Sequence, residues 1–385
     1  MTFKKCTLCE TPINEDNDSE EHIFANAVGG WSTVKKFICV ECNNKKGKTW
    51  DAELARQFAW LSLMAGIKRD RGEVQPVVVK TASGIEYRMR SDGSMEPHRF
   101  KFSRDSVGEQ VKISFVARNF DEVNTKLSEL KKKYPQMNIE EARESAKMTT
   151  TYLDEPLVGS LPEGGADVGR SIIMTALAYA SEQGIDPACC ELVLPFLRSP
   201  NEVLETRYGW SYLTDSIKNR KAGKIFHCIS LFGNPEMSKL FAYVELFSYG
   251  RWHIALSDQY IGPMIQTTYA IDPSEAQEIN IEVDWKGPLA RIEEVLIGNG
   301  FDSSNVLKAM DSLMPELMGR SSQRAYTVAF ENALKNVLDS MGLTMESIIS
   351  PELLQVISGK IIEQMMPFFR KQRSLKRLSL SSDMN

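Results

Sequence analysis

Apolar residues recur along most of this chain at helix or strand spacing, but residues 1–50 show little such periodicity. The first clear helical pattern follows Asp51, where Leu54, Phe58 and Leu61 are spaced by four and then three residues. This spacing predicts a helix that Asp51 caps. Beyond it, strands are predicted over residues 77–79, 85–89 and 111–117, and a charged helix over 120–134.

A second patterned region begins near residue 160. Val168, Ile172, Ala176 and Ala180 lie on one face of a predicted helix, which Gly184 ends. Strands are predicted over residues 225–231, 240–247, 252–256 and 267–271, and a Gly-Asn-Pro-Glu turn joins the first two. From residue 287 onward the pattern is helical.

Composition narrows the class of protein. Seven cysteines in 385 residues are too few for a disulfide-built scaffold. No apolar run is long enough for a bilayer, and the first residues lack the apolar core of a signal peptide. We therefore expect a cytoplasmic protein without a membrane partner. The net charge of −5 does not exclude nucleic acid, because phosphate binding needs only a local basic patch.

Four of the seven cysteines form two closely spaced pairs, Cys6-x-x-Cys9 and Cys39-x-x-Cys42. Each pair puts two thiolates on one tight turn, and two such turns complete a tetrahedral site with four sulfur ligands. The sequence therefore predicts a structural Zn²⁺. A thioredoxin-like redox role would need one such pair entering a helix in a βαβ unit, and that context is missing.

The long gap between the cysteine pairs holds Glu20-Glu21-His22-Ile23 and then Gly29-Gly30, and Asn43 follows Cys42 directly. This arrangement resembles the HNH (ββα-metal) endonuclease family, in the zinc-stapled branch that includes phage Holliday-junction resolvases. The resemblance covers residues 6–51. It implies a first strand with the acidic residue and the His, a Gly-rich turn back to the cysteines, and a helix beginning at Asn43.

The resemblance implies a catalytic role for His22, Glu21 and Asn43. Hydrolysis of a phosphodiester needs a base and a cation, and an imidazole with a pKa near 6.5 is well suited to take a proton from water. Glu21 and Asn43 offer hard oxygen ligands, which favour Mg²⁺ or Mn²⁺. Strand alternation, however, puts Glu20 on the face of His22, so Glu20 remains a rival ligand. Asn43 could also cap the helix.

Three lysines after Asn43, namely Lys45, Lys46 and Lys48, are candidates for nucleic-acid binding, although a solvated face is the alternative. The chain also departs from the family pattern. Ala25 stands where the family commonly has Pro, and the middle Asn of the HNH name has no clear match. Asn26 is a candidate substitute for it. His227 alternates with Ile225 and Ile229, which indicates a side chain inside a sheet.

Together these observations predict an α+β chain. We expect an HNH ββα-metal nuclease domain with structural zinc over residues 1–66 and a β-rich segment with one helix over 67–158. A mixed α/β domain of unknown role over 159–286 and a helical region with a basic tail over 287–385 would follow.

The predicted function is metal-dependent cleavage of DNA, with a bacterial or phage defence role implied by the resemblance alone. The alternatives are an RNA-cutting nuclease and a non-catalytic zinc-knuckle module that binds nucleic acid or protein. A homodimer through the C-terminal helices would suit the cutting of both strands of a duplex.

Overall fold

The structure is a computed structural model, which describes residues 4–72, 74–91, 93–107, 110–118, 120–146, 153, 155–158, 164–199 and 207–381. Its contacts divide the chain into two compact units, each made of two stretches. Unit 1 comprises Met1–Gln75 and Ser160–Arg320, and unit 2 comprises Pro76–Gly159 and Ser321–Asn385. The finer division into four segments stays a prediction, but residues 1–75 and 160–320 fold as parts of one unit.

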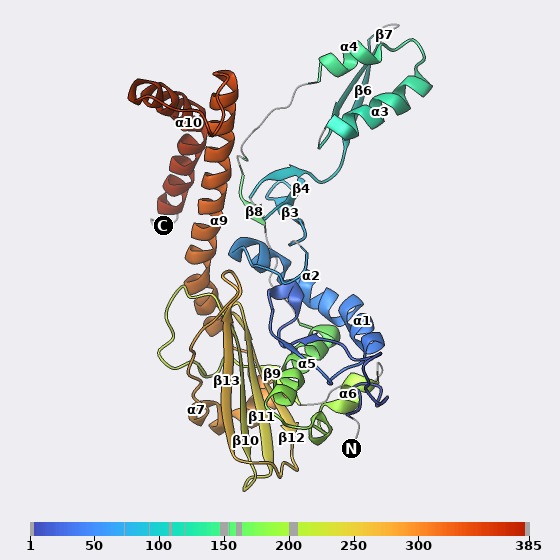
Figure 1. Ribbon diagram of the computed structural model, residues 1–385, viewed down its shortest axis with the longest axis vertical. Helices are drawn as coiled ribbons and strands as arrows, with labels where there is room; N and C mark the ends of the chain where they lie inside the picture. The colour runs from blue at the N-terminus through green and yellow to red at the C-terminus, as the bar shows by residue number, and fades with distance from the viewer. Residues whose placement is uncertain are drawn as a thin grey trace. The chain divides into compact units, whose positions relative to one another are not determined.

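Unit 1 is built around a six-stranded antiparallel sheet with the strand order β14-β13-β10-β11-β12-β9 (Figure 1). The strands are β9 Tyr208–Trp210, β10 His227–Asn234, β11 Lys239–Leu246, β12 Gly250–Ser257, β13 Ile265–Asp272 and β14 Gln277–Glu278. The predicted turn after Gly233 joins β10 to β11, with Asn234 opposite Lys239. All four strands predicted in this region are thus confirmed.

The central strands are apolar on both faces because both faces of the sheet are covered. On β10, Ile229 and Leu231 point into one apolar core, whereas Cys228 points into a second core on the opposite face. The second core also takes in Trp285 and Ile292 from the segments that follow the sheet. These segments contain α7 Lys286–Ala290, α8 Ile292–Glu294 and the π-helix Val295–Asn299.

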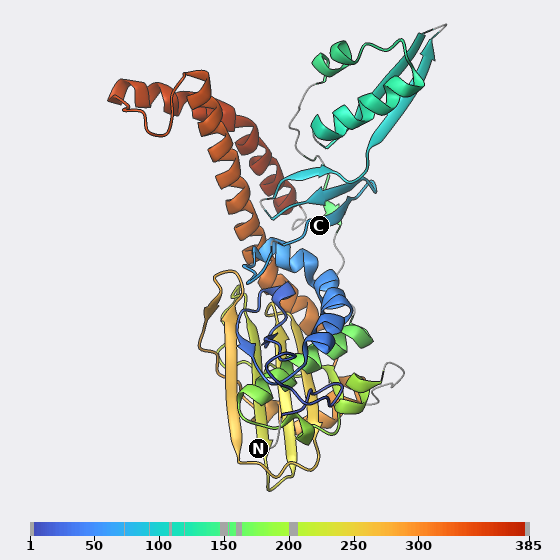
Figure 2. The same cartoon turned by 45° about the vertical axis from the view of Figure 1, so that its right-hand side comes forward.

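The first core lies between the sheet and helix α5, Ala166–Glu182, which contacts β10 and β11 on one side and α2 on the other. The α2 helix, Trp50–Ala65, comes from the N-terminal stretch, and its Leu54, Phe58 and Leu61 enter the same core. Figure 2 shows the N-terminal helices beside α5 on this face of the sheet. Two short helices, Pro187–Cys189 and α6 Leu194–Arg198, follow α5.

The N-terminal stretch has the strand–strand–helix order predicted for it. Strands β1 Glu21–His22 and β2 Thr33–Val34, each two residues long, pair as a hairpin. The short 3₁₀ helix Asn26–Val28 lies between them, and α1 Val40–Lys48 follows. Two predicted boundaries are wrong. Helix α1 begins at Val40 instead of Asn43, and α2 begins at Trp50 without a side-chain cap. Asp51 lies in the first turn of α2, where its carboxylate is occupied by Lys46 and Ser171.

Unit 2 contains two small antiparallel sheets and several helices. One sheet has the order β5-β4-β3-β8 and the other is the hairpin β6-β7. Its elements are β3 Val77–Thr81, β4 Glu86–Met89, β5 Met95–Pro97, β6 Lys101–Val107, β7 Gln110–Val116, α3 Phe120–Lys133, α4 Ile139–Glu144, β8 Leu157–Val158 and α10 Pro351–Ser381. The predicted strands and the helix over 120–134 are confirmed within a few residues.

Helix α9, Ser303–Ser340, contributes residues to both units. The region from residue 287 is helical, as predicted, and the mixed α+β class is confirmed. The side chains of the predicted basic tail beyond Arg370 lie outside the described residues. No helix among the described residues is both long and apolar enough to cross a membrane.

Candidate active site and metal centre

The two cysteine pairs meet at one place in the N-terminal module. The Sγ atoms of Cys6, Cys9, Cys39 and Cys42 all lie within 4.8 Å of one another. Cys39 is the residue that precedes α1, and its backbone N–H donates to Cys6 Sγ at 3.4 Å. Cys9 Sγ lies 3.7 Å from Cys39 Sγ. That distance matches the edge of a tetrahedron with metal–sulfur bonds of about 2.3 Å.

The chemistry of these four donors fits a zinc ion. Burial and the neighbouring Cys9 thiol raise the pKa of Cys42, so the cluster cannot become fully anionic without a compensating positive charge. A divalent cation supplies that charge and takes thiolates as ligands. Four protein ligands would leave no open coordination position, which is typical of a structural site.

The two residues of β1, Glu21 and His22, turn their side chains to opposite faces of the strand. Glu21 points into the module and is only 3% exposed, and its Oε1 lies 2.7 Å from Lys46 Nζ. Lys46 Nζ also lies 2.5 Å from an Asp51 carboxylate oxygen. Glu21 is therefore committed to a buried ion pair and does not face His22. This geometry does not favour Glu21 as the metal ligand predicted from the sequence.

The three lysines predicted to bind phosphate occupy different environments. Lys45 and Lys48 are exposed on α1, whereas Lys46 is 3% exposed. Burial works against the charged form of Lys46, but Glu21 and Asp51 outweigh it and hold its pKa above the ordinary value. The predicted contact of Lys46 with nucleic acid does not fit this buried position, because Lys46 would have to abandon two carboxylates to reach a phosphate.

His22 is largely buried on the hairpin, with its side chain 13% exposed. Its Nε2 is 3.3 Å from Asp70 Oδ2, the one charged partner of this ring among the described residues. Burial lowers the pKa of His22 from its usual value, although the hydrogen bond to Asp70 works in the opposite direction. The imidazole is therefore neutral near pH 7 and able to accept a proton.

Asp70 is held beside His22 by Asn26. The Asn26 side-chain oxygen accepts hydrogen bonds from the backbone N–H groups of Asp70, at 3.0 Å, and Arg71, at 3.3 Å. Its amide nitrogen donates to the Arg71 carbonyl at 3.1 Å. Asn26 thus supports the loop that holds Asp70 next to His22. Ala25 has a φ of −51°, close to the angle that proline would impose.

The Gly-rich turn between the strands is fixed by close packing. A Cβ atom on Gly30 would lie 1.7 Å from the Phe24 carbonyl oxygen, so only glycine fits there. The neighbouring carbonyl of Val28 accepts a hydrogen bond from Nε2 of His227 at 2.8 Å. His227 is fully buried at the start of β10, as its alternation predicted. The six-stranded sheet therefore supports the turn that precedes β2.

Asn43 is the fourth residue of α1 and does not cap it. Its side-chain N–H group donates to Ser19 Oγ at 3.2 Å and to the Glu20 carbonyl at 3.4 Å. The Asn43 amide oxygen faces no hydrogen-bond donor among the described residues. Glu20 is exposed, and its carboxylate lies 2.9 Å from Lys35 and 3.9 Å from Arg71. Asn43 thus contacts the backbone of β1's neighbour Glu20, two residues before His22, and the Glu20 carboxylate is exposed.

The structure thus joins His22, Asn43 and Glu20 around β1 and turns Glu21 and Lys46 inward. Sequence reasoning missed Asp70, because it lies 48 residues from His22 and in no motif. It also missed Ser171, whose hydroxyl donates to Asp51 at 2.7 Å from α5. The sequence signal near Asp70 was the basic stretch of Lys68, Arg69 and Arg71, and it does not identify Asp70 itself.

Comparison with known proteins agrees with this geometry. Residues 6–59 match a family model described as HNH endonuclease. No curated protein and no solved structure shows a significant match to the chain. The matched residues include both cysteine pairs, the β1–β2 hairpin, α1 and the first turns of α2. The N-terminal part of this chain is therefore an HNH endonuclease-type module with four cysteines positioned to hold a metal ion.

Proposed function

We propose that the N-terminal module hydrolyses phosphodiester bonds in DNA, with His22 as the general base. The observation that carries the proposal is the placement of His22 within an HNH-type module. Its imidazole is partly accessible on the hairpin, is neutral near pH 7 and is held by Asp70 at 3.3 Å. A base poised in this way takes the proton from the attacking water.

The contact with Asp70 assigns the two nitrogens of His22 to different tasks. With the proton on Nε2 and directed at the Asp70 carboxylate, Nδ1 keeps its lone pair for water. Asp70 also stabilises the imidazolium that forms when His22 takes a proton, because opposite charges attract at this distance. Asp70 acts through His22 and is a positioning residue.

A divalent cation, Mg²⁺ or Mn²⁺, would stabilise the negative charge that develops on the phosphate and the leaving oxygen. Such ions keep several waters and need only one or two carboxylates from the protein, so the sparse oxygen groups beside His22 fit them. Asn43 and an acidic residue of the Glu20-Glu21 pair would hold the ion. We infer that this acidic residue is Glu20, since Glu21 is occupied by Lys46 in the interior.

Lys45 and Lys48 are the exposed cations of α1 that could meet the phosphate backbone. Contacts of this kind position a nucleic acid without reading its sequence, so they serve RNA as well as DNA. DNA is proposed here because of the resemblance to the junction-resolvase branch. RNA cleavage by the same site is the alternative outcome of the test below.

The decisive experiment compares cleavage of plasmid DNA, linear DNA and RNA by the purified full chain with Mg²⁺, with Mn²⁺ and with chelator. Cleavage should need a divalent cation and should fall by about 10²–10⁴-fold in His22→Ala at matched zinc content. Asn43→Ala should weaken the response to Mg²⁺, whereas Asn44→Ala, its exposed neighbour on α1, serves as the matched control. Equal cutting by the wild type and His22→Ala would remove His22 from the mechanism.

The acidic ligand is tested separately with Glu20→Gln and Glu21→Gln. If Glu20 holds the cation, Glu20→Gln should raise the Mg²⁺ concentration needed for cleavage without changing thermal stability. Glu21→Gln should lower thermal stability instead, because it breaks the buried pair with Lys46. The opposite pattern would return the ligand role to Glu21.

A non-catalytic zinc-knuckle module is the alternative function. If neither wild type nor His22→Ala cuts any nucleic acid, while the wild type binds it, the zinc-knuckle binding module becomes the better interpretation.

We also propose a cytoplasmic location, a role in defence, and a homodimer through the C-terminal helices. Exposed apolar side chains on unit 2, including Met345, Ile348 and Leu354, support the dimer, which light scattering of the purified chain would test.

A further inference from the structure

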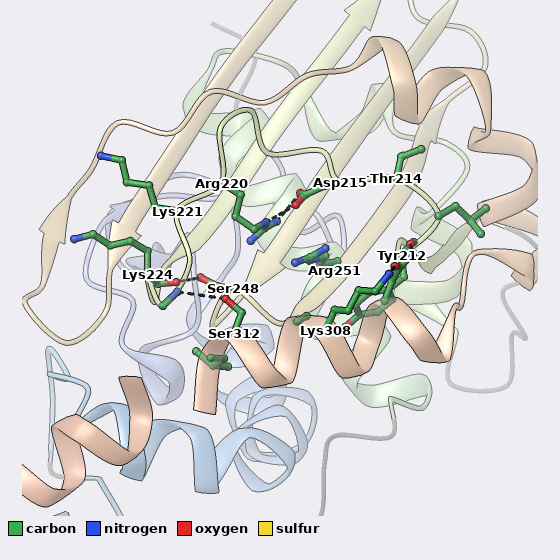
Figure 3. A pocket seen from close by; sticks show the side chains of 15 residues that line it. Tyr212, Thr214, Asp215, Arg220, Lys221, Lys224, Ser248, Arg251, Lys308 and Ser312 are labelled. Carbon is green, nitrogen blue, oxygen red and sulfur yellow. Dashed lines mark hydrogen bonds and ion pairs between the residues drawn. The ribbon is translucent and has the colours of Figure 1, made fainter. Parts of the chain in front are cut away.

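Unit 1 contains a basic pocket that the nuclease site does not use. It has a volume of about 240 Å³ and lies between the 212–224 loop, the strand ends near Ser248 and Arg251, and the first turns of α9. Figure 3 shows the guanidinium groups of Arg220 and Arg251 near its centre, with Lys221 and Lys224 extending from one side. Lys308 on α9 completes the set of cations in the lining.

The charges in this pocket are not balanced. Five cations line it, whereas Asp215 is the only carboxylate in the lining and Glu245 lies beneath it. Arg220 is fully engaged by these acids, through Asp215 at 2.6 Å and Glu245 at 2.8 Å. The two carboxylates thus fix Arg220 and leave most of the positive charge of the pocket uncompensated.

Arg251 is the residue that points most directly to a ligand. It is 7% exposed, and its Nε donates to Glu245 at 3.2 Å. Its guanidinium also lies 5.5 Å from the centre of the Tyr212 ring. Within the described part of the chain, the two terminal nitrogens of Arg251 have no hydrogen-bond acceptor. Glu245 pairs the charge of Arg251, but the terminal N–H groups at the pocket remain available to donate to the oxygens of an anion.

The three lysines of the pocket form an exposed rim. Lys221, Lys224 and Lys308 make no ion pair with any carboxylate among the described residues, although Lys308 Nζ donates to the Asn305 side chain at 3.3 Å. Elsewhere on the same unit, exposed lysines such as Lys68 and Lys218 do pair with nearby acids. The rim lysines are therefore free to meet a ligand from solvent.

We propose that this pocket binds the phosphate end of a small molecule with two or more phosphate groups, such as a nucleoside diphosphate or triphosphate. Arg251 provides paired donors that suit phosphate oxygens, and the lysine rim provides several further charges. A pocket of about 240 Å³ is smaller than the sites that enclose whole drug-sized ligands, so the remainder of the molecule extends beyond it. The proposal does not depend on nuclease activity.

The test measures binding of two probes, inorganic pyrophosphate and ATP, to the full zinc-loaded chain by calorimetry in a phosphate-free buffer. The variant that tests the rim replaces Lys221, Lys224 and Lys308 together by Gln, which leaves the buried ion pairs intact. Lys286→Gln, an exposed lysine outside the pocket, is the control. A second variant, Ser312→Glu, puts a negative charge on an exposed lining position.

Binding of both probes should weaken by roughly tenfold or more in the triple variant and in Ser312→Glu, and stay unchanged in Lys286→Gln. A short oligonucleotide is titrated in parallel. If only the oligonucleotide binds, and the same variants weaken it, the pocket takes phosphate from nucleic acid instead of a small molecule. Absence of binding by all probes, or binding that none of the pocket variants changes, would overturn the proposal.

Discussion

The N-terminal module and the six-stranded sheet are parts of one compact unit and share an apolar core, yet they differ in strand length and in the contacts added to that core. The strands of the module are two residues long, and its stability depends on a cysteine cluster and on a buried ion pair. The four central strands of the sheet are eight residues long, and three of them are almost wholly buried between two apolar cores. The module thus adds a cysteine cluster and a buried ion pair to the apolar core that it shares with the sheet, whereas the sheet has long paired strands.

The difference shows how a nuclease module keeps polar groups at its surface. Under the proposed function, the module would have to leave His22 and Asn43 open to a phosphate, so part of its surface could not be covered by apolar packing. A metal ion held by the four cysteines would add stability without covering the site. Helix α5 then connects the two parts, because it contacts α2 and the sheet and because Ser171 binds Asp51.

The largest expected effect comes from removing the metal, which should unfold the module and leave the sheet folded. Replacing Cys39 by Ser, or stripping the metal with a strong chelator, should unfold the module, since structural zinc contributes about 10–16 kcal/mol. The sheet should keep its strands because their pairing and the second core involve none of the four cysteines, although Cys6 and Cys39 border the first core. Hydrogen exchange measured by mass spectrometry would show protection lost over residues 6–48 and retained over β10–β12.

The matched control for the metal is Cys189→Ser, because Cys189 is an exposed cysteine outside the cluster. It should leave the exchange pattern and the zinc content unchanged. Equal protection of the module with and without metal would show that apolar packing alone holds it, and the contrast between the two parts would disappear.

The next largest effect tests how much the buried contacts of Lys46 with Glu21 and Asp51 stabilise the module. Lys46→Met keeps the length of the side chain but leaves Glu21 and Asp51 buried without their cation, which should lower the free energy of unfolding by about 3–5 kcal/mol. Lys48→Met, two residues along the same helix and exposed, should change it by less than about 0.5 kcal/mol. Chemical denaturation of the zinc-loaded variants makes the comparison, and similar values for both would assign Lys46 to the surface.

The smallest effect concerns the contact between the sheet and the module. Burial lowers the pKa of His227 to about 4, so the folded chain holds it neutral, with Nε2 donating to Val28 and Nδ1 accepting from Phe247. The unfolded chain takes up a proton near pH 6.5. Below that pH the folded state therefore loses stability, by up to about 3 kcal/mol once the pH falls below the folded pKa.

His227→Gln removes this proton linkage, so its stability should fall less steeply than that of the wild type between pH 7 and pH 4. His253, which is also buried with a lowered pKa, is present in both proteins and cancels in the comparison. The measurement is the free energy of unfolding across this pH range. Parallel curves would mean that protonation of His227 does not oppose folding.

The sequence by itself determined the elements whose signals are local. Alternating and helical spacings predicted the four central strands, the α5 helix and α3, because each depends on neighbours within one element. The two cysteine pairs predicted a metal cluster, since only a shared ion explains such spacing in one short stretch. The motif around His22 indicated an HNH-type module, which the family match supports.

The tertiary structure decided what depends on distant partners. Strand alternation raised the conflict between Glu20 and Glu21, but only the burial of Lys46 against Glu21 and Asp51 explains why Glu21 turns inward. Asp70 meets His22, and Arg251 lines a basic pocket, only because chain segments far apart in sequence come together. Such contacts leave no periodic trace in the sequence, because long-range packing, and not local spacing, creates them.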